Sequence, residues 1–297
     1  MAGILLLDGP NLLHRTHWVA QKSNLINEKG EDVGCEFKFL RSLFSLANRF
    51  RPAGFYVAWD RGSIDPNYRK TLTEGTYKAG RDKSSQDSVD ASEAKVIPVI
   101  ANLGIKNMVS NVLEADDLIA WLANKLEEQM VTIVSCDKDF LQLVKTRIQV
   151  FSPSKQQLYT IENFESLIGV KPINYLRYKA MCGDPADNLK RTELKGLGPK
   201  TALKVMNGDA VLSTQQERAV HDLVHLMSLQ DGLLAHPGEK EFYEQQFQLL
   251  QDHKPDFETF KKYCKDNNFK SILNAFDKWK LAFGKNRLVE LINSLTV

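Results

Sequence analysis

Residues 3–10 read GILLLDGP, an apolar run that stops at Asp8. A short continuous apolar run bounded by turn residues predicts a buried β-strand followed by a turn. The same arrangement recurs in GFYVAWD at residues 54–60, where Asp60 follows the apolar run. Residues 131–135, VTIVS, form a third such run just before another pair of aspartates. These runs predict buried strands with carboxylates at the strand ends.

Helical patterns alternate with strands along the first part of the chain. Apolar spacing predicts further strands and intervening helices, with strands at 105–109, 148–151 and 157–160 and helices at 37–50, 92–103 and 116–128. This alternation favours an α/β fold with a mostly parallel sheet flanked by helices. Beyond about residue 170 the strand-like runs stop and the rest is predicted to be helical, which places a domain boundary between 170 and 180.

Composition indicates an ordinary globular protein. The chain has 297 residues, of which 43% are hydrophobic and 26% are charged, as in typical globular domains. The N-terminal apolar run is too short for a signal peptide or a membrane span. Four cysteines without a CxxC pair argue against a zinc site and suit a reducing compartment. We therefore expect a cytoplasmic protein that does not enter a membrane.

Nine carboxylates lie close to apolar runs: Asp8, Asp60, Glu114, Asp116, Asp117, Asp137, Asp139, Asp184 and Asp187. An unpaired charge near the core is costly, and a shared divalent metal ion is a simple counter-charge. In a parallel α/β sheet, sites lie at the carboxyl ends of the strands. Nine carboxylates exceed the needs of one Mg²⁺, and two ions suit in-line displacement at a phosphodiester.

Each acidic cluster alone has an ordinary alternative explanation. Asp116 or Asp117 can be a helix N-cap, and Asp8 can be a turn residue. A lone DxD pair such as Asp137 and Asp139 is weak evidence for a metal site. The spacings are nevertheless compatible with a shared site, because Asp137 and Asp139 share a face if their segment is extended, and Asp184 and Asp187 share one if theirs is helical. The clusters together are harder to explain by caps and turns, so the joint pattern predicts one acidic site.

Two basic segments predict contacts with nucleic acid, although the net charge is only +2. In LKGLGPKTALKV at 194–205, glycines allow close approach to a phosphate and the following helix N-terminus attracts anions. The residues that we assign to this contact are Lys195, Gly196, Gly198, Lys200 and Thr201. A glycine C-cap followed by proline, and a solvated basic face, remain the alternatives.

The second basic segment, YRKTLTEGTYKAGR at 68–81, interleaves aromatic and cationic side chains. This composition suits single-stranded nucleic acid, through base stacking and phosphate neutralisation. The cations assigned to this role are Arg69, Lys70, Lys78 and Arg81, with Tyr77 as an aromatic partner. The surrounding polar stretch is long, and long loops of this kind are often functional or disordered.

The motifs LLLDGPNLLHR, YVAWD, YKAGR, EADD, SCDKDF, GDPADN and GLGPKTA occur in this order. Together they resemble the flap endonuclease / 5′-3′ exonuclease family, which includes bacteriophage 5′ nucleases and the nuclease domain of bacterial DNA polymerase I. The resemblance covers nearly the whole chain, and the length is similar to that of a bacteriophage flap endonuclease or RNase H without a polymerase. One departure is LKRTELK at 189–195, where relatives commonly carry a link rich in proline and glycine.

The resemblance implies a PIN-like nuclease domain over 1–175 with a helical arch at about 61–100. It also implies a helical DNA-binding domain over 176–297 with a helix–three-turn–helix at about 180–207. Asp8, Asp60, Glu114, Asp116, Asp117 and Asp137 would serve a first metal ion, and Asp137, Asp139, Asp184 and Asp187 a second. Mg²⁺ is the implied metal, with Mn²⁺ able to substitute, and a K⁺ is implied around Leu194 to Leu197.

Four residues are implied to contact the nucleic acid at the site of reaction. Lys78 and Arg81 would contact the scissile phosphate and act in catalysis with Asp8 and Asp137. Tyr77 would stack on a base, and Arg15 is a weaker candidate for a phosphate contact.

The expected function is hydrolysis of 5′ flaps, 5′ ends and RNA primers during DNA replication or repair, by a monomer in the cytoplasm (of the host, if phage-encoded). The expected partners are flap or 5′-ended DNA, RNA–DNA hybrid and replication proteins. One alternative is a structure-specific DNA-binding protein with little turnover. Another is a small-molecule phosphohydrolase, which would need a DxD pair after the first strand, where this chain has Asp8 followed by glycine and proline.

Overall fold

The computed structural model describes residues 3–23, 25–61, 68–73, 77–78, 86–184, 187, 189 and 192–284. Its strands form a six-stranded sheet with the order β3-β2-β1-β4-β5-β6. These strands are β1 (Ile4–Asp8), β2 (Gly54–Asp60), β3 (Lys106–Ser110), β4 (Val131–Val134), β5 (Ile148–Ser152) and β6 (Gln157–Tyr159). β1 pairs with β2 in parallel, as does β4 with β5, whereas β6 is antiparallel to β5. The predicted α/β class with a mostly parallel sheet is confirmed.

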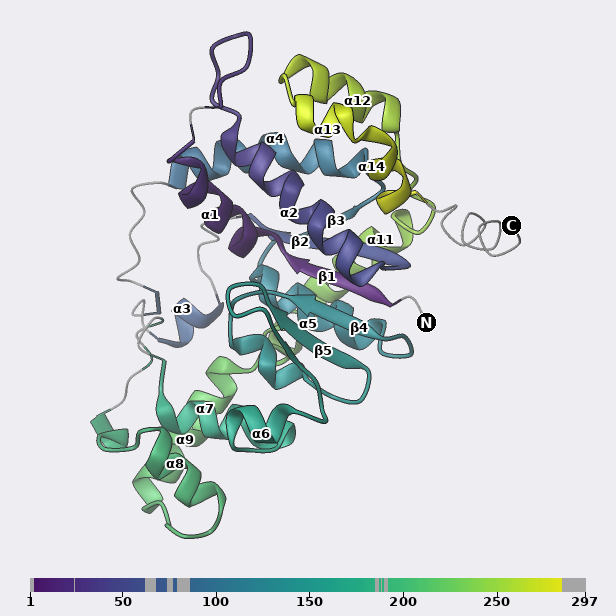
Figure 1. The fold of residues 1–297 in the computed structure, drawn as a ribbon. Helices are drawn as coiled ribbons and strands as arrows, with labels where there is room; N and C mark the ends of the chain where they lie inside the picture. Colours follow the sequence, from purple (N-terminus) through teal and green to yellow (C-terminus); the bar gives the residue numbers. More distant parts are fainter. Residues whose placement is uncertain are drawn as a thin grey trace. The chain divides into compact units, whose positions relative to one another are not determined.

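Helices account for most of the remaining described chain (Figure 1). In chain order the α-helices are α1 (Gly9–Ala20), α2 (Gly34–Phe50), α3 (Tyr68–Leu72), α4 (Gln86–Ala101), α5 (Ala115–Lys125), α6 (Phe164–Ile168), α7 (Tyr175–Cys182), α8 (Pro199–Met206), α9 (Thr214–Met227), α10 (Asp231–Ala235), α11 (Pro237–Leu249), α12 (Phe257–Asp266), α13 (Lys270–Asn274) and α14 (Phe276–Phe283). Short 3-10 helices are η1 (Asp139–Leu143), η2 (Pro172–Asn174) and η3 (Thr192–Leu194). None of the described helices is long and apolar enough to cross a membrane.

All six predicted strands are confirmed to within one residue at each end. β1 and β4 are buried along their whole length, and β2 is buried except at its two end residues. Continuous burial of this kind is typical of parallel strands covered on both faces. The helices predicted at 37–50, 92–103 and 116–128 correspond to α2, α4 and α5. The alternative of a simple turn at Asp8 is wrong, because α1 begins at Gly9 and Asp8 is its N-cap, accepting a hydrogen bond from the Asn11 N–H at 3.0 Å.

The described residues pack as two compact units that interleave along the chain. The first unit draws on residues 1–59, 84–108 and 244–297, and the second on 60–83 and 109–243. In the first unit α14 lies beside α2 (Figure 1), with the rings of Phe44 and Trp279 stacked at 4.6 Å. The ring of Phe269, just before α13, lies 5.2 Å from that of Phe37 in α2. The division into functional domains at 175/176 stays a prediction, since compactness does not assign those roles.

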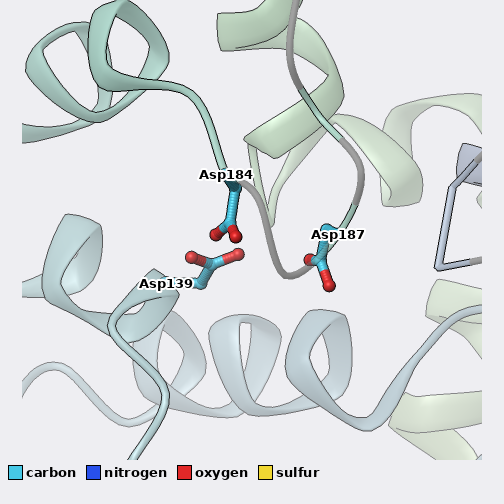
Figure 2. A group of neighbouring side chains, drawn as sticks. All are labelled: Asp139, Asp184 and Asp187. Carbon is cyan, nitrogen blue, oxygen red and sulfur yellow. The ribbon is translucent and has the colours of Figure 1, made fainter. Parts of the chain in front are cut away.

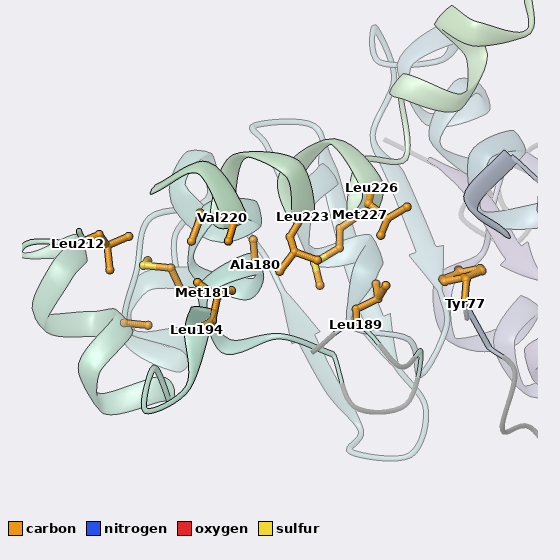
Figure 3. Close-up of a cluster of buried hydrophobic side chains, with 12 residues drawn as sticks. Tyr77, Ala180, Met181, Leu189, Leu194, Leu212, Val220, Leu223, Leu226 and Met227 are labelled. Atoms are coloured by element: carbon orange, nitrogen blue, oxygen red, sulfur yellow. The ribbon is translucent and has the colours of Figure 1, made fainter. Parts of the chain in front are cut away.

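The second unit contains a buried apolar cluster that joins α7, η3, α8 and α9. Figure 3 shows Ala180 and Met181 of α7 turned toward Val220 and Leu223 of α9. Burying apolar side chains is the main stabilising contribution to such a helical assembly. The cluster therefore positions α8, whose N-terminus carries the GLGPK segment, relative to α7.

Gly9 lies so close to its neighbours that a side chain has no room in the first unit. A Cβ at this position would meet Trp59 Cε3 at 2.7 Å and the Ala58 carbonyl oxygen at 2.8 Å. We expect Gly9→Ala to lower the free energy of unfolding in urea by about 1–3 kcal/mol, because overpacking forces the backbone to shift. Gly238→Ala is the matched control, since its Cβ would meet nothing within 4 Å; equal stability of the two variants would contradict this prediction.

Candidate active site

Three of the predicted metal ligands come together in the second unit. The carboxylates of Asp139, Asp184 and Asp187 offer oxygen atoms that all lie within 4.8 Å of one another. Figure 2 shows the Asp139 and Asp184 carboxylates facing each other, with Asp187 beside them. Within the described part of the chain no other three acidic, histidine or cysteine side chains gather as closely. We call these three residues the carboxylate trio.

Local hydrogen bonding, rather than an extended strand, positions Asp139. The Asp137 N–H donates to Ser135 Oγ at 3.0 Å, and Asp137 Oδ1 accepts from the Asp139 N–H at 2.8 Å. Short polar side chains compete in this way with regular backbone pairing. The extended geometry predicted for Asp137 and Asp139 is therefore wrong, because the chain turns after β4 and Asp139 starts η1.

Asp184 is positioned by the end of α7. Gly183 follows the helix with φ +70°, a conformation that favours glycine and stops the helix. Asp184 then exchanges backbone hydrogen bonds with Leu189 at 3.0 and 2.8 Å. The helical spacing predicted for Asp184 and Asp187 is therefore wrong, since α7 ends at Cys182 and both residues lie outside it.

The trio holds a cation from the protein itself. Lys179 of α7 is only 9% exposed, and its ammonium contacts the carboxylates of Asp139 and, at 2.9 Å, of Asp184. Sequence reasoning missed this residue. The available signal was a lysine within the otherwise apolar end of α7, five residues before Asp184.

A second acidic group surrounds the N-terminus of α5. Asp60, at the end of β2, accepts a hydrogen bond from the Ala115 N–H at 3.2 Å. Glu114 is the N-cap residue of α5, and its N–H donates to Asp117 Oδ2 at 3.1 Å. Negative charge at a helix N-terminus is stabilised by the helix dipole. The structure therefore brings Asp60, Glu114 and Asp117 to one helix end, with the half-buried Asp116 in the same first turn.

Asp117 is neutralised by a buried arginine. Arg69 is 3% exposed and Asp117 is fully buried, and the guanidinium donates two hydrogen bonds to that carboxylate, at 2.7 and 2.8 Å. Arg69 also donates to Glu114 at 3.2 Å and to the carbonyl oxygens of Leu226 and Ser228. Burial alone would lower the pKa of Arg69, but Asp117 holds it well above its usual value. Asp117, a predicted metal ligand, and Arg69, a predicted DNA contact, thus form a buried ion pair with each other, and those two roles stay predictions.

Tyr77 and Lys78 contact the same group through Glu114. The Tyr77 hydroxyl donates to Glu114 Oε2 at 3.1 Å, and Lys78 Nζ lies 2.6 Å from Oε1. Burial would raise the pKa of Glu114, but the charges of Lys78 and Arg69 lower it overall. Tyr77 is 4% exposed and belongs to the apolar cluster of the second unit, so its ring is covered in this structure. Its stacking on a base stays a prediction.

The remaining predicted residues divide between the two units. Asp8 is buried and Arg15 is half-buried in α1, both in the first unit. Lys70 is half-buried in α3 of the second unit, and Arg81 lies outside the described residues.

The GLGPK segment forms the start of α8, with Gly198 as the N-cap residue and Pro199 as the first helical residue. Gly196 has φ +89°, and nothing lies within 4 Å of a Cβ built on either glycine. Lys195 and Lys200 are exposed, and Thr201 Oγ1 donates to the Gly196 carbonyl at 3.4 Å. The backbone is therefore open to a ligand, as the phosphate-binding interpretation requires.

Comparison with known proteins identifies the family. Residues 3–169 match the model of the 5′-3′ exonuclease, N-terminal resolvase-like domain. The 5′-3′ exonuclease of Aquifex aeolicus is 34% identical over 212 residues, which cover 69% of this chain and 69% of that protein. The flap endonuclease Xni of Shewanella woodyi is 31% identical over 208 residues, covering 69% of this chain and 77% of the relative. The chain belongs to the 5′-3′ exonuclease family.

Some relatives are much longer than this chain. DNA polymerase I of Treponema pallidum is 33% identical over 209 residues, but the match covers only 20% of that polymerase. Among solved structures, the bacteriophage T5 D15 protein co-crystallised with metal ions has a TM-score of 0.65 at 16% identity. That alignment covers 84% of this chain and 99% of the other. At this identity the similarity shows a shared fold.

Proposed function

We propose that this protein is a divalent-metal-dependent 5′ nuclease that hydrolyses phosphodiesters in 5′ flaps, 5′ ends and RNA primers. The observation that carries the proposal is the carboxylate trio, which lies in a chain of the 5′-3′ exonuclease family. Relatives named 5′-3′ exonuclease and flap endonuclease support this assignment. A role in replication or repair in the cytoplasm, RNase H activity and action as a monomer belong to the same proposal.

The residues present fit Mg²⁺, or Mn²⁺ in its place. Carboxylate oxygens are the ligands that these hard ions prefer, and the trio already accommodates an ammonium. Asp139, Asp184 and Asp187, with Asp137, would hold one ion, and Asp60, Glu114, Asp116, Asp117 and Asp137 would serve another. Asp8 keeps its predicted role as a metal ligand. When bound, a pair of such ions polarises water and stabilises the leaving oxygen of a phosphodiester.

The protein's own cations would bind and orient the nucleic acid. Lys78, held by Glu114 at 2.6 Å, would stabilise charge on the scissile phosphate together with Arg81. Arg15 and Lys70 would contribute further phosphate contacts. Lys195, Gly196, Gly198, Lys200 and Thr201 would hold the duplex backbone without reading its sequence, and the nearby carbonyls would suit a K⁺.

The test is a cleavage assay on an end-labelled 5′-flap duplex and on an RNA–DNA hybrid, with Mg²⁺ and with EDTA. We expect Mg²⁺-dependent products from the flap that carry a 5′-phosphate, and none in EDTA. A chromogenic phosphomonoester run in parallel is expected to stay intact. Phosphomonoester hydrolysis without flap cleavage would overturn the proposal in favour of a small-molecule phosphohydrolase, and tight flap binding without cleavage in favour of a binding protein.

A further inference from the structure

Lys179 occupies the place where a metal ion would neutralise the carboxylate trio. Its side chain is nine-tenths buried, and its ammonium bridges Asp139 and Asp184. The third member, Asp187, has an oxygen within the same 4.8 Å group (Figure 2). Three carboxylates this close repel one another strongly unless a positive charge lies among them.

Two features distinguish Lys179 from a surface ion pair. The carboxylates it contacts come from different segments, one at the start of η1 and one after α7, so the ammonium joins two loops. Lys179 and its two carboxylate partners are also largely buried. Removing one partner of a buried ion pair leaves an uncompensated charge away from water. By contrast, Lys138 adjoins Asp139 in sequence but is exposed.

We propose that Lys179 is a built-in counter-ion that competes with a divalent metal ion for the carboxylate trio. With no metal bound, the ammonium neutralises the trio and holds its carboxylates close together. A metal ion binds by displacing the ammonium, which can swing away because the lysine side chain is long and flexible while α7 stays in place. Because the ammonium and the metal ion cannot occupy the trio together, the stability that Lys179 contributes there is subtracted from the metal affinity. The inference rests on the proposed function for the identity of the competing ion.

Lys179→Met tests the competition in the full-length protein without DNA. We expect calorimetric titration with Mn²⁺ or Mg²⁺ to show at least about tenfold tighter binding at the carboxylate trio than in the wild type. In EDTA, we expect a Tm lower than wild type by roughly 5–10 °C, and saturating Mg²⁺ is expected to remove most of that difference. Lys179→Arg, which keeps the charge, is expected to retain weak metal binding.

Lys138→Met is the matched control, because it removes one positive charge beside the trio without removing the bridging ammonium. We expect its metal affinity and its Tm in EDTA to stay close to wild type. If Lys179→Met folds only in Mg²⁺ and unfolds reversibly on chelation, the inference is supported in its strongest form. Unchanged or weaker metal affinity in Lys179→Met, or an equal effect of Lys138→Met, would overturn it.

These outcomes are distinct from those of the cleavage assay. A wild-type protein that binds Mg²⁺ and cleaves flaps, with no change of affinity in Lys179→Met, refutes the counter-ion role alone. A wild-type protein that never cleaves a flap refutes the proposed function, whatever its metal affinity.

Discussion

Replacing Arg69 with methionine is expected to lower the free energy of unfolding by about 3–5 kcal/mol, because it leaves a buried carboxylate without its counter-charge. Arg69 and Asp117 are joined by two short hydrogen bonds and are withdrawn from water. The guanidinium also donates hydrogen bonds to the carbonyl oxygens of Leu226 and Ser228. Chemical denaturation in EDTA, monitored by circular dichroism, measures the loss without interference from bound metal.

The double variant Arg69→Met with Asp117→Asn separates charge from packing. Asparagine keeps an oxygen that can accept the Glu114 N–H, while both buried charges are removed. Because a neutral buried pair needs no counter-charge, we expect the double variant to recover more than half of the lost stability. Arg147→Met is the control, since its pair with Glu128 is exposed and worth less than about 1 kcal/mol. A loss in Arg69→Met no larger than in this control would show that the buried pair is not important.

Replacing Asp184 with asparagine is expected to reduce Mg²⁺-dependent flap cleavage by at least about a hundredfold, since a lost metal ligand removes several kcal/mol of charge stabilisation. Asp184 contributes an oxygen to the trio and contacts Lys179 at 2.9 Å. Asparagine has nearly the same shape, so the fold and the duplex contacts are expected to persist. Single-turnover rates on a labelled flap measure the loss, and anisotropy in EDTA measures flap binding.

Glu128→Gln is the control for Asp184→Asn, because it removes one negative charge from a side chain that is 93% exposed. We expect its cleavage rate to match wild type. Retention of the wild-type rate in Asp184→Asn would contradict a metal site at the trio. Loss of flap binding together with cleavage would instead indicate a role in holding DNA.

The local sequence pattern was sufficient to predict the strands of the sheet, because they are short, mostly apolar and followed by turn residues. GILLLDGP predicts β1, which ends at Asp8, and α1 begins at the next residue, Gly9. That helix was missed since Asp8, Gly9 and Pro10 form an equally good turn signal and helix start. The same limit applies to Asp137 and Asp184, where a side-chain hydrogen bond and a left-handed glycine replaced the predicted strand and helix geometry.

The sequence by itself determined the α/β architecture, the position of the acidic residues at the ends of strands and helices, and membership of a nuclease family. Only the tertiary structure decided which charges neutralise which. Arg69 reaches Asp117 across 48 positions. Lys179 reaches Asp139 across a segment that contains β5, β6 and α6. Such pairings depend on which segments pack together, and no local spacing encodes that. For this reason the sequence did not predict that Arg69 is the buried partner of Asp117, or that Lys179 bridges two carboxylates of the trio.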